Sequence, residues 1–140
     1  MFPDEIEKQL PPRIPETYRM PAEWEPHYGV WLTWPRREGI SFPGQYDKIP
    51  PVYVRLIEQI VRSEHVSINV WDKEMADEVR QVLGDVYLEN RESISLLINR
   101  AYEPWCRDHG PIFVLRTTMI DGELYCERAV VDWKYNAWGG

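Results

Sequence analysis

Apolar and polar side chains alternate through the segment Val66-Ser67-Ile68-Asn69-Val70-Trp71, which is the pattern of a β-strand. Asp72 follows as a candidate N-cap of a helix of about eleven residues, with Gly84 just past its end. A second apolar run, residues 94–98, predicts a buried strand. A strand, a helix and a strand in this order make a right-handed crossover with parallel strands. We therefore expect an α/β fold.

Upstream of this unit, the sequence predicts a strand at residues 29–34, a loop at 36–51 and a helix at 52–63. The helix is expected because apolar side chains of residues 52–63 share one face, and Pro51 is tolerated in a first turn. Residues 1–28 carry six of the 12 prolines, so they predict an extended arm.

Downstream, residues 112–115 and onward predict antiparallel strands that turn at Asp121-Gly122 and continue to Trp133. The fold class is thus α/β with mixed parallel and antiparallel strands. We expect two parts, an arm at 1–28 and one domain at 29–140. Because the chain stops on two glycines after an aromatic turn, we expect this domain to be truncated.

Composition narrows the possible partners. The net charge of −7 argues against a nucleic-acid partner, because phosphate binding needs clustered Lys and Arg. No stretch approaches the roughly 20 apolar residues of a membrane span, and the start is not a secretory signal. We therefore expect a cytoplasmic protein with free thiols, no membrane partner and no cofactor.

Potentially reactive side chains are most concentrated in the segment Glu103-Pro104-Trp105-Cys106-Arg107-Asp108-His109-Gly110-Pro111. It follows the predicted strand at 94–98, and loops at that position often hold the site of an α/β protein. Arg107 and Asp108 could instead form a structural ion pair.

Cys106 is a candidate nucleophile, because Arg107 and His109 would lower its pKa, but we favour a buried or idle thiol. Cys106 and His109 could also form half of a zinc site. Cys126, His65 and His27 offer no second close pair, so we expect no metal.

Further aromatic and polar residues are expected to have structural roles. Trp24, Trp31 and Trp34 predict packing, although Trp34-Pro35-Arg36 ends a strand and could reach the rim of a pocket. Glu23 and His27 predict cap or anchor groups in the arm, and His65 is expected at the end of a helix.

Five segments together resemble one family, the agmatine deiminases and the similar bacterial-type peptidylarginine deiminases of the guanidinium-modifying pentein superfamily. The matching segments are Met20-Pro21-Ala22-Glu23-Trp24-Glu25-Pro26-His27, Trp31-Leu32-Thr33-Trp34-Pro35, Pro51-Val52-Tyr53, Trp105-Cys106-Arg107-Asp108-His109-Gly110-Pro111 and Asn136-Ala137-Trp138-Gly139-Gly140. The resemblance implies a fan of five ββαβ modules, of which this chain would hold about two.

The resemblance also implies a function. A cysteine thiolate would attack a guanidinium carbon, ammonia would leave and a ureido product would remain. Asp108 corresponds to the carboxylate that binds the guanidinium, Trp105 would line the pocket, and Arg107 and His109 would support the loop. The motifs of the nucleophilic Cys and the catalytic His are absent from these residues.

The substrate implied is agmatine or peptidyl-arginine, and agmatine would connect the protein with putrescine and polyamine biosynthesis. This segment alone is expected to be inactive. As a part of a closed ring it is also expected to self-associate through uncovered strand edges. The alternative is a non-catalytic α/β binding module on the same scaffold.

Overall fold

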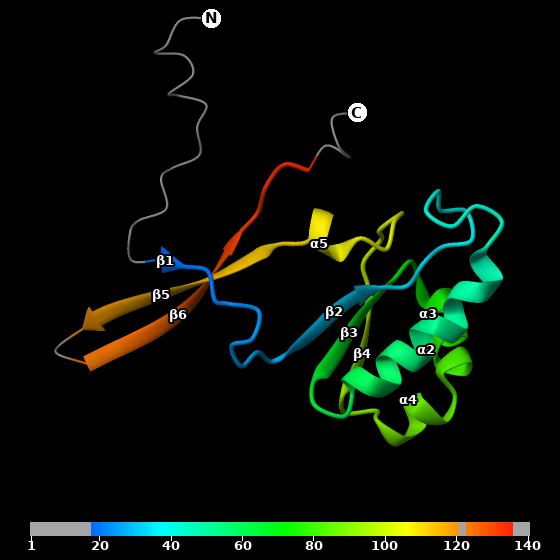
Figure 1. The fold of residues 1–140 in the computed structure, drawn as a ribbon, viewed down its shortest axis with the longest axis horizontal. Helices are drawn as coiled ribbons and strands as arrows, with labels where there is room; N and C mark the ends of the chain where they lie inside the picture. The colour runs from blue at the N-terminus through cyan, green and yellow to red at the C-terminus, as the bar shows by residue number, and fades with distance from the viewer. Residues whose placement is uncertain (1–17, 121–122, 136–140) are drawn as a thin grey trace, which may run out of the picture. The chain divides into compact units, whose positions relative to one another are not determined.

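The structure is a computed structural model that describes residues 18–120 and 123–135. It divides into two compact units (Figure 1). One unit spans Pro26–His109, and the other joins the described residues of Met1–Glu25 and Gly110–Gly140. The expected segment Asn136–Gly140, the turn at Asp121-Gly122 and most of the proline-rich arm lie outside the described residues.

The unit at 26–109 is built on a parallel three-stranded sheet with the order β2-β3-β4. Its strands are β2 (Gly29–Thr33), β3 (His65–Val70) and β4 (Ile94–Ile98). Helix α2 (Ile49–Ile60) connects β2 to β3, and helices α3 (Lys73–Leu83) and α4 (Asp85–Glu89) connect β3 to β4. Because both connections advance in the same direction across the sheet, right-handed crossovers bring these helices to one face (Figure 1).

The hydrophobic core lies between that face and the helices. Its buried members come from β3, β4, the end of β2 and the inner faces of α2 and α3: Trp34, Ile57, Val66, Ile68, Val70, Ala76, Val79, Leu83 and Ile94. The α/β fold and its parallel crossover are therefore confirmed. The expectation of a buried strand at residues 94–98 is wrong in part, since Ile98 at the end of the edge strand β4 is 65% exposed.

Helix α3 follows its sequence signals closely. The Asp72 side chain accepts a hydrogen bond of 2.9 Å from the backbone N–H of Met75, and Gly84 ends the helix with a φ of 53°. A left-handed φ of this kind favours glycine, because a side chain would meet its own carbonyl. The short helix α4 begins directly after Gly84 and was not expected.

Helix α2 differs from its prediction at its beginning. It starts at Ile49, and the 3₁₀ turn η1 (Tyr46–Lys48) precedes it, so the expected loop at 36–51 is wrong beyond Gln45. Pro50 and Pro51 lie in the first turn, where backbone N–H groups have no intrahelical acceptor. The two prolines therefore begin the helix, although they resemble a loop in sequence.

The second unit is an antiparallel sheet with the order β1-β5-β6. Strands β5 (Ile112–Ile120) and β6 (Glu123–Val131) pair from Ile112 opposite Val131 to Ile120 opposite Glu123, which confirms the predicted antiparallel strands. Strand β1 (Tyr18–Arg19) pairs with the outer side of β5. At least this part of the proline-rich arm thus lies at a sheet edge.

Candidate functional site

The sheet face opposite the core carries a network of polar side chains. Asn69 of β3 is only 3% exposed and donates from Nδ2 to Thr33 Oγ1 of β2 at 3.0 Å. Its Oδ1 accepts from Trp31 Nε1 at 2.8 Å and from Asn99 Nδ2 at 3.4 Å. Parallel sheets are usually apolar on both faces, so a polar face in one is a feature that needs an explanation.

The segment that follows β4 folds against this polar face. Residues Cys106–His109 form a single helical turn, α5, in the stretch that was predicted to be a loop. The Cys106 thiol lies 2.9 Å from Thr33 Oγ1, so it joins α5 to the end of β2. Burial raises the pKa of Cys106 above its ordinary value, and the hydrogen bond to Thr33 opposes that shift only in part. A raised pKa keeps the thiol neutral at neutral pH, which disfavours Cys106 as a nucleophile.

Asp108 lies on α5 with an exposed carboxylate. Its backbone N–H donates to the Trp105 carbonyl at 3.0 Å, and that carbonyl also accepts from the His109 N–H at 3.3 Å. Across residues 18–120 and 123–135, the Asp108 side chain makes no hydrogen bond and no ion pair, including with Arg107. Among the described residues, nothing therefore competes with an external cation for this carboxylate.

Trp105 lies three positions before Asp108 and is 46% exposed. Its Nε1 donates to Ser41 Oγ at 2.8 Å, and its ring centroid lies 6.3 Å from that of Phe42. His109 Nε2 lies 3.3 Å from the carbonyl oxygen of Glu103, which ties the two ends of the segment together. The segment thus presents a partly exposed aromatic ring and, three positions later, a carboxylate that has no partner among the described residues.

A second cluster, of which the sequence suggested only Arg36, forms where the three parallel strands end. The Arg36 guanidinium lies 3.8 Å from the Trp71 ring centroid, and the Arg100 guanidinium lies 5.5 Å from it. Tyr102 meets Trp71 edge-on at 5.0 Å. Position could have suggested this cluster, because these residues follow β2, β3 and β4, whose carboxyl ends share one edge of the sheet.

Several other predicted residues lie elsewhere. His65 is in β3 and not at the end of a helix; its Nε2 is 2.9 Å from Ser95 Oγ and its ring stacks on Tyr28. Trp34 is in the core as expected, whereas Trp24 is 88% exposed and Trp31 contacts Asn69 on the polar face. Packing is thus the wrong interpretation for Trp24.

His27 and Cys126, which the sequence also singled out, lie outside the segment 103–109. His27 pairs with Glu64 at 2.7 Å, as an anchor would. Cys126 is exposed on β6. Within the described part of the chain, no three His, Cys, Asp or Glu side chains gather as metal ligands would.

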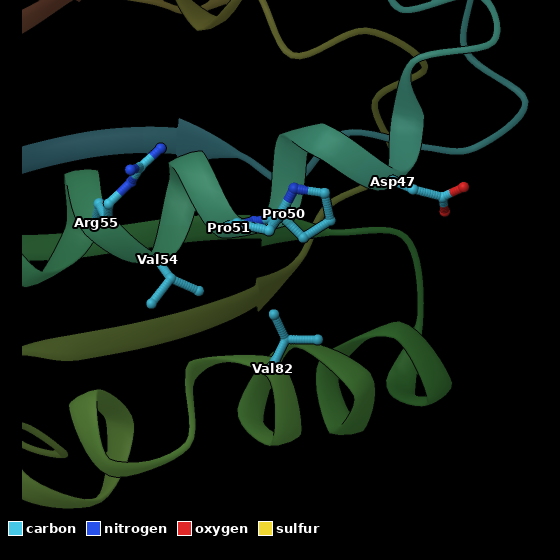
Figure 2. A pocket seen from close by; sticks show the side chains of 6 residues that line it. All are labelled: Asp47, Pro50, Pro51, Val54, Arg55 and Val82. Atoms are coloured by element: carbon cyan, nitrogen blue, oxygen red, sulfur yellow. The ribbon is translucent and has the colours of Figure 1, made fainter.

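One surface hollow is formed by η1, α2 and α3, with a volume of about 620 Å³. Figure 2 shows Val54 of α2 and Val82 of α3 pointing toward each other, with Asp47, Pro50, Pro51 and Arg55 around them. No residue of the 103–109 segment lines it. We therefore place the candidate site at the Trp105–Asp108 segment and not in this hollow.

Comparisons with known proteins identify a family. The family model for Porphyromonas-type peptidyl-arginine deiminase matches residues 19–140. The chain is 34% identical over 123 residues to a putative agmatine deiminase of Selenomonas ruminantium, covering 88% of this chain and 30% of that protein. A putative agmatine deiminase of Pectobacterium atrosepticum is 33% identical over 123 residues, covering 88% of this chain and 29% of that protein. The chain thus spans about 30% of the length of these relatives.

Solved structures show the same fold. The putative arginine deiminase of Porphyromonas gingivalis superposes with a TM-score of 0.62 at 25% identity, covering 87% of this chain and 32% of that one. A C. jejuni agmatine deiminase with substrate bound superposes with a TM-score of 0.64 at 16% identity, covering 87% of this chain and 31% of that one.

In the described residues, no helix is both long and apolar enough to cross a membrane.

Proposed function

Because this chain belongs to the family of Porphyromonas-type peptidyl-arginine deiminases, we propose that it supplies the guanidinium-binding part of a deiminase. The observation that carries the proposal is the exposed Asp108 carboxylate, which has no partner among the described residues and lies three positions from the half-exposed Trp105 ring. A guanidinium is flat and cationic. A carboxylate can bind two of its N–H groups at once, and an aromatic face can cover its plane.

The proposed reaction replaces one C–N bond with a C–O bond. A cysteine thiolate adds to the guanidinium carbon, a histidine donates a proton to the departing nitrogen, and ammonia leaves. Water then adds to the resulting thiouronium carbon with the same histidine as base, and the C–S bond breaks to give a ureido product. Cys106 is not assigned to this role, because its pKa is raised by burial. The nucleophile and the histidine are proposed to come from sequence outside these 140 residues.

Two substrates suit the proposal, agmatine and an arginine side chain in a peptide. Both present the same guanidinium, and the names of the relatives include both. We further propose a cytoplasmic protein that acts, if its substrate is agmatine, in the formation of putrescine. We propose no metal and no cofactor, because thiolate and acid–base chemistry suffice for this hydrolysis.

The test is replacement of Asp108 by Asn in the full-length protein that contains these residues. Ammonia release from agmatine and from an arginine-containing peptide should fall roughly 30-fold or more, because a charge-assisted pair becomes a neutral contact. Asp85→Asn is the matched control, since Asp85 is another exposed carboxylate, on α4. Kinetics equal to those of the unchanged protein in Asp108→Asn would remove Asp108 from the site.

The alternative is a binding module that catalyses no reaction. Calorimetric titration with agmatine or the peptide, compared with ammonia release, distinguishes it from a deiminase. If the unchanged protein binds agmatine or the peptide and releases no ammonia, the module is favoured. If both binding and ammonia release depend on Asp108, the deiminase is favoured. Sequencing past the codon of Gly140 adds an independent check, because a deiminase needs a downstream histidine motif and a glycine-rich cysteine motif.

A further inference from the structure

The loop between β2 and η1 is distant in sequence from the candidate site and contacts it through Glu103. The backbone N–H of Ile40 donates to Glu103 Oε1 at 2.9 Å, and the Ser41 hydroxyl donates to Glu103 Oε2. Both oxygens of one carboxylate are therefore engaged by consecutive residues of the loop between β2 and η1. Carboxylate acceptors make stronger hydrogen bonds than neutral ones, so this loop is held firmly.

Ser41 also forms a hydrogen bond with Trp105. Its Oγ accepts a hydrogen bond of 2.8 Å from Trp105 Nε1 while its own proton points toward Glu103. Trp105 thus donates to Ser41, and Ser41 donates to the Glu103 carboxylate. A hydroxyl that donates to a carboxylate is a better acceptor, because chained hydrogen bonds polarise one another.

The backbone of the loop is shaped for this approach. A Cβ at Gly39 would lie 3.2 Å from the Arg36 carbonyl oxygen, 3.3 Å from Glu103 Oε1 and 3.3 Å from the Tyr102 carbonyl oxygen. Those distances are tighter than ordinary van der Waals contact, so a side chain there would push the loop away from Glu103. Glycine at this position lets the loop lie directly against the segment that carries the site.

The connection has an electrostatic consequence for the aromatic ring. An indole whose N–H donates toward a carboxylate has more electron density over its face, which strengthens its attraction for a cation. The same hydrogen bond fixes the rotation of the ring, which is 46% exposed and could otherwise take other rotamers. Orientation and electron density therefore change together when the connection is broken.

From this geometry we infer that Ser41 and Glu103 are positioning residues, which orient Trp105 and increase its affinity for a flat cationic head group. The inference rests on the proposed function, because it assigns a guanidinium as the ligand of the ring. It adds Ser41, which lies outside the segment 103–111, and gives a role to Glu103, which lies in that segment and had none. They act through Trp105 and do not touch the reacting atoms.

The central experiment is Ser41→Ala in the full-length protein, with ammonia release measured over a range of agmatine concentrations. KM should rise roughly three- to tenfold, the size of a lost cation–π contribution, and kcat should stay within about twofold. Ser41→Thr keeps the hydroxyl and should restore most of the affinity. Glu103→Gln should give an intermediate rise in KM, because the amide keeps the shape and loses the charge.

A double-mutant cycle with Trp105→Phe distinguishes positioning from general loosening of the loop. Phenylalanine keeps a ring and lacks the N–H donor, so Ser41→Ala should add little to KM in that background. The matched control is Arg37→Gln, in the same loop. It breaks the 2.7 Å ion pair with Asp47 without touching Ser41 or Trp105, and should leave KM unchanged.

The outcomes separate the inference from the function on which it rests. If Trp105→Phe and Asp108→Asn both raise KM while Ser41→Ala and Glu103→Gln do not, the inference is wrong and the proposed function stands. If Ser41→Ala raises KM equally in the presence and absence of the Trp105 N–H, the role is structural and the inference is also wrong. If Trp105→Phe and Asp108→Asn both leave KM and kcat unchanged, the proposed function fails as well. Should Ser41→Ala not fold, Glu103→Gln in the same cycle decides between these outcomes.

Discussion

The two faces of the sheet β2-β3-β4 differ in chemistry although they come from the same strands. On one face, Val66, Ile68 and Val70 are buried under α2 and α3. On the other, Asn69 lies in a hydrogen-bond network with Thr33 and Trp31. Side chains alternate with period two in a strand, so one six-residue segment can serve a core and a candidate site at once.

The difference shows how a rigid site is made. The apolar face has close-packed side chains that hold the backbone in place, and the polar face has directional contacts that hold particular atoms. α5 attaches to the second face through the contact of Cys106 with Thr33, so the positions of Trp105 and Asp108 depend on the first face indirectly. Substitutions on the two faces should therefore have separable effects on stability and on ligand binding.

The largest effect is expected from Ile68→Ala. Ile68 is 0% exposed, and removing its side chain leaves a cavity that neighbours fill only in part. The free energy of unfolding should fall by about 2–5 kcal/mol, measured by urea denaturation. Val52→Ala on the exposed side of α2 is the control and should change it by less than about 0.5 kcal/mol. A cost for Ile68→Ala as small as that of the control would contradict the two-face description.

Asn69→Ala tests the polar face. It removes the acceptor of Trp31 Nε1 and the donor to Thr33 Oγ1, and leaves buried polar groups without partners. The expected loss is about 1–3 kcal/mol of unfolding free energy. Asn99→Ala, which removes only the 3.4 Å contact with Asn69, should cost less. If Asn99→Ala costs as much as Asn69→Ala, the network is not centred on Asn69.

Asp72→Ala tests the cap that fixes α3 on the apolar face. Loss of the hydrogen bond to the Met75 N–H should cost about 1 kcal/mol, read from the same denaturation curves. Asp72→Asn keeps a side-chain oxygen at the cap and should recover most of that loss. Equal destabilisation by both variants would mean that the negative charge matters here and the hydrogen bond does not.

Alkaline pH should destabilise the protein through Tyr53 of α2. Burial, with a smaller contribution from nearby Cys106, raises the pKa of Tyr53 from its ordinary value of 10.0 to about 12. The folded state thus holds this proton more tightly than the unfolded state. The stability that results is fully present below pH 10 and is lost as the pH rises toward about 12.

The measurement is the melting temperature between pH 8 and 12, compared with that of Tyr53→Phe. The variant lacks the ionising group, so its melting temperature should fall less over this range. Burial also raises the pKa of Cys106, so ionisation of this thiol at alkaline pH would destabilise the folded state in the same direction. Cys106→Ala removes that contribution and is the second control. Parallel curves for Tyr53→Phe and the unchanged protein would exclude Tyr53 as the cause.

The elements with strong local signals were predictable. Asp72 and Gly84 mark the ends of α3 because capping and a left-handed φ depend on neighbouring residues only. Pro50 and Pro51 misled the prediction of α2, since proline is equally suited to loops and to first turns. His65 was misplaced because its strand starts one residue before the apolar alternation that revealed it.

The candidate site was predictable only in its central segment. Trp105 and Asp108 are close in sequence, so their association needs no tertiary structure. Ser41 bonds to Trp105, which is 64 positions away in the sequence. Asn69 bonds to Thr33, which is 36 positions away. No local pattern marks such partners, because a serine or asparagine in isolation suits a loop or a strand equally well.

The sequence by itself determined the parallel crossover, the cap and end of α3, and the segment that carries the aromatic ring and the carboxylate. These depend on periodicity, backbone preference and residue order, which are local properties of a chain. Only the tertiary structure decided that the second sheet face is polar, that the Cys106 thiol contacts Thr33, and that Glu103 contacts the loop between β2 and η1. Those features depend on which strand ends lie side by side, and that arrangement follows from packing of the whole unit.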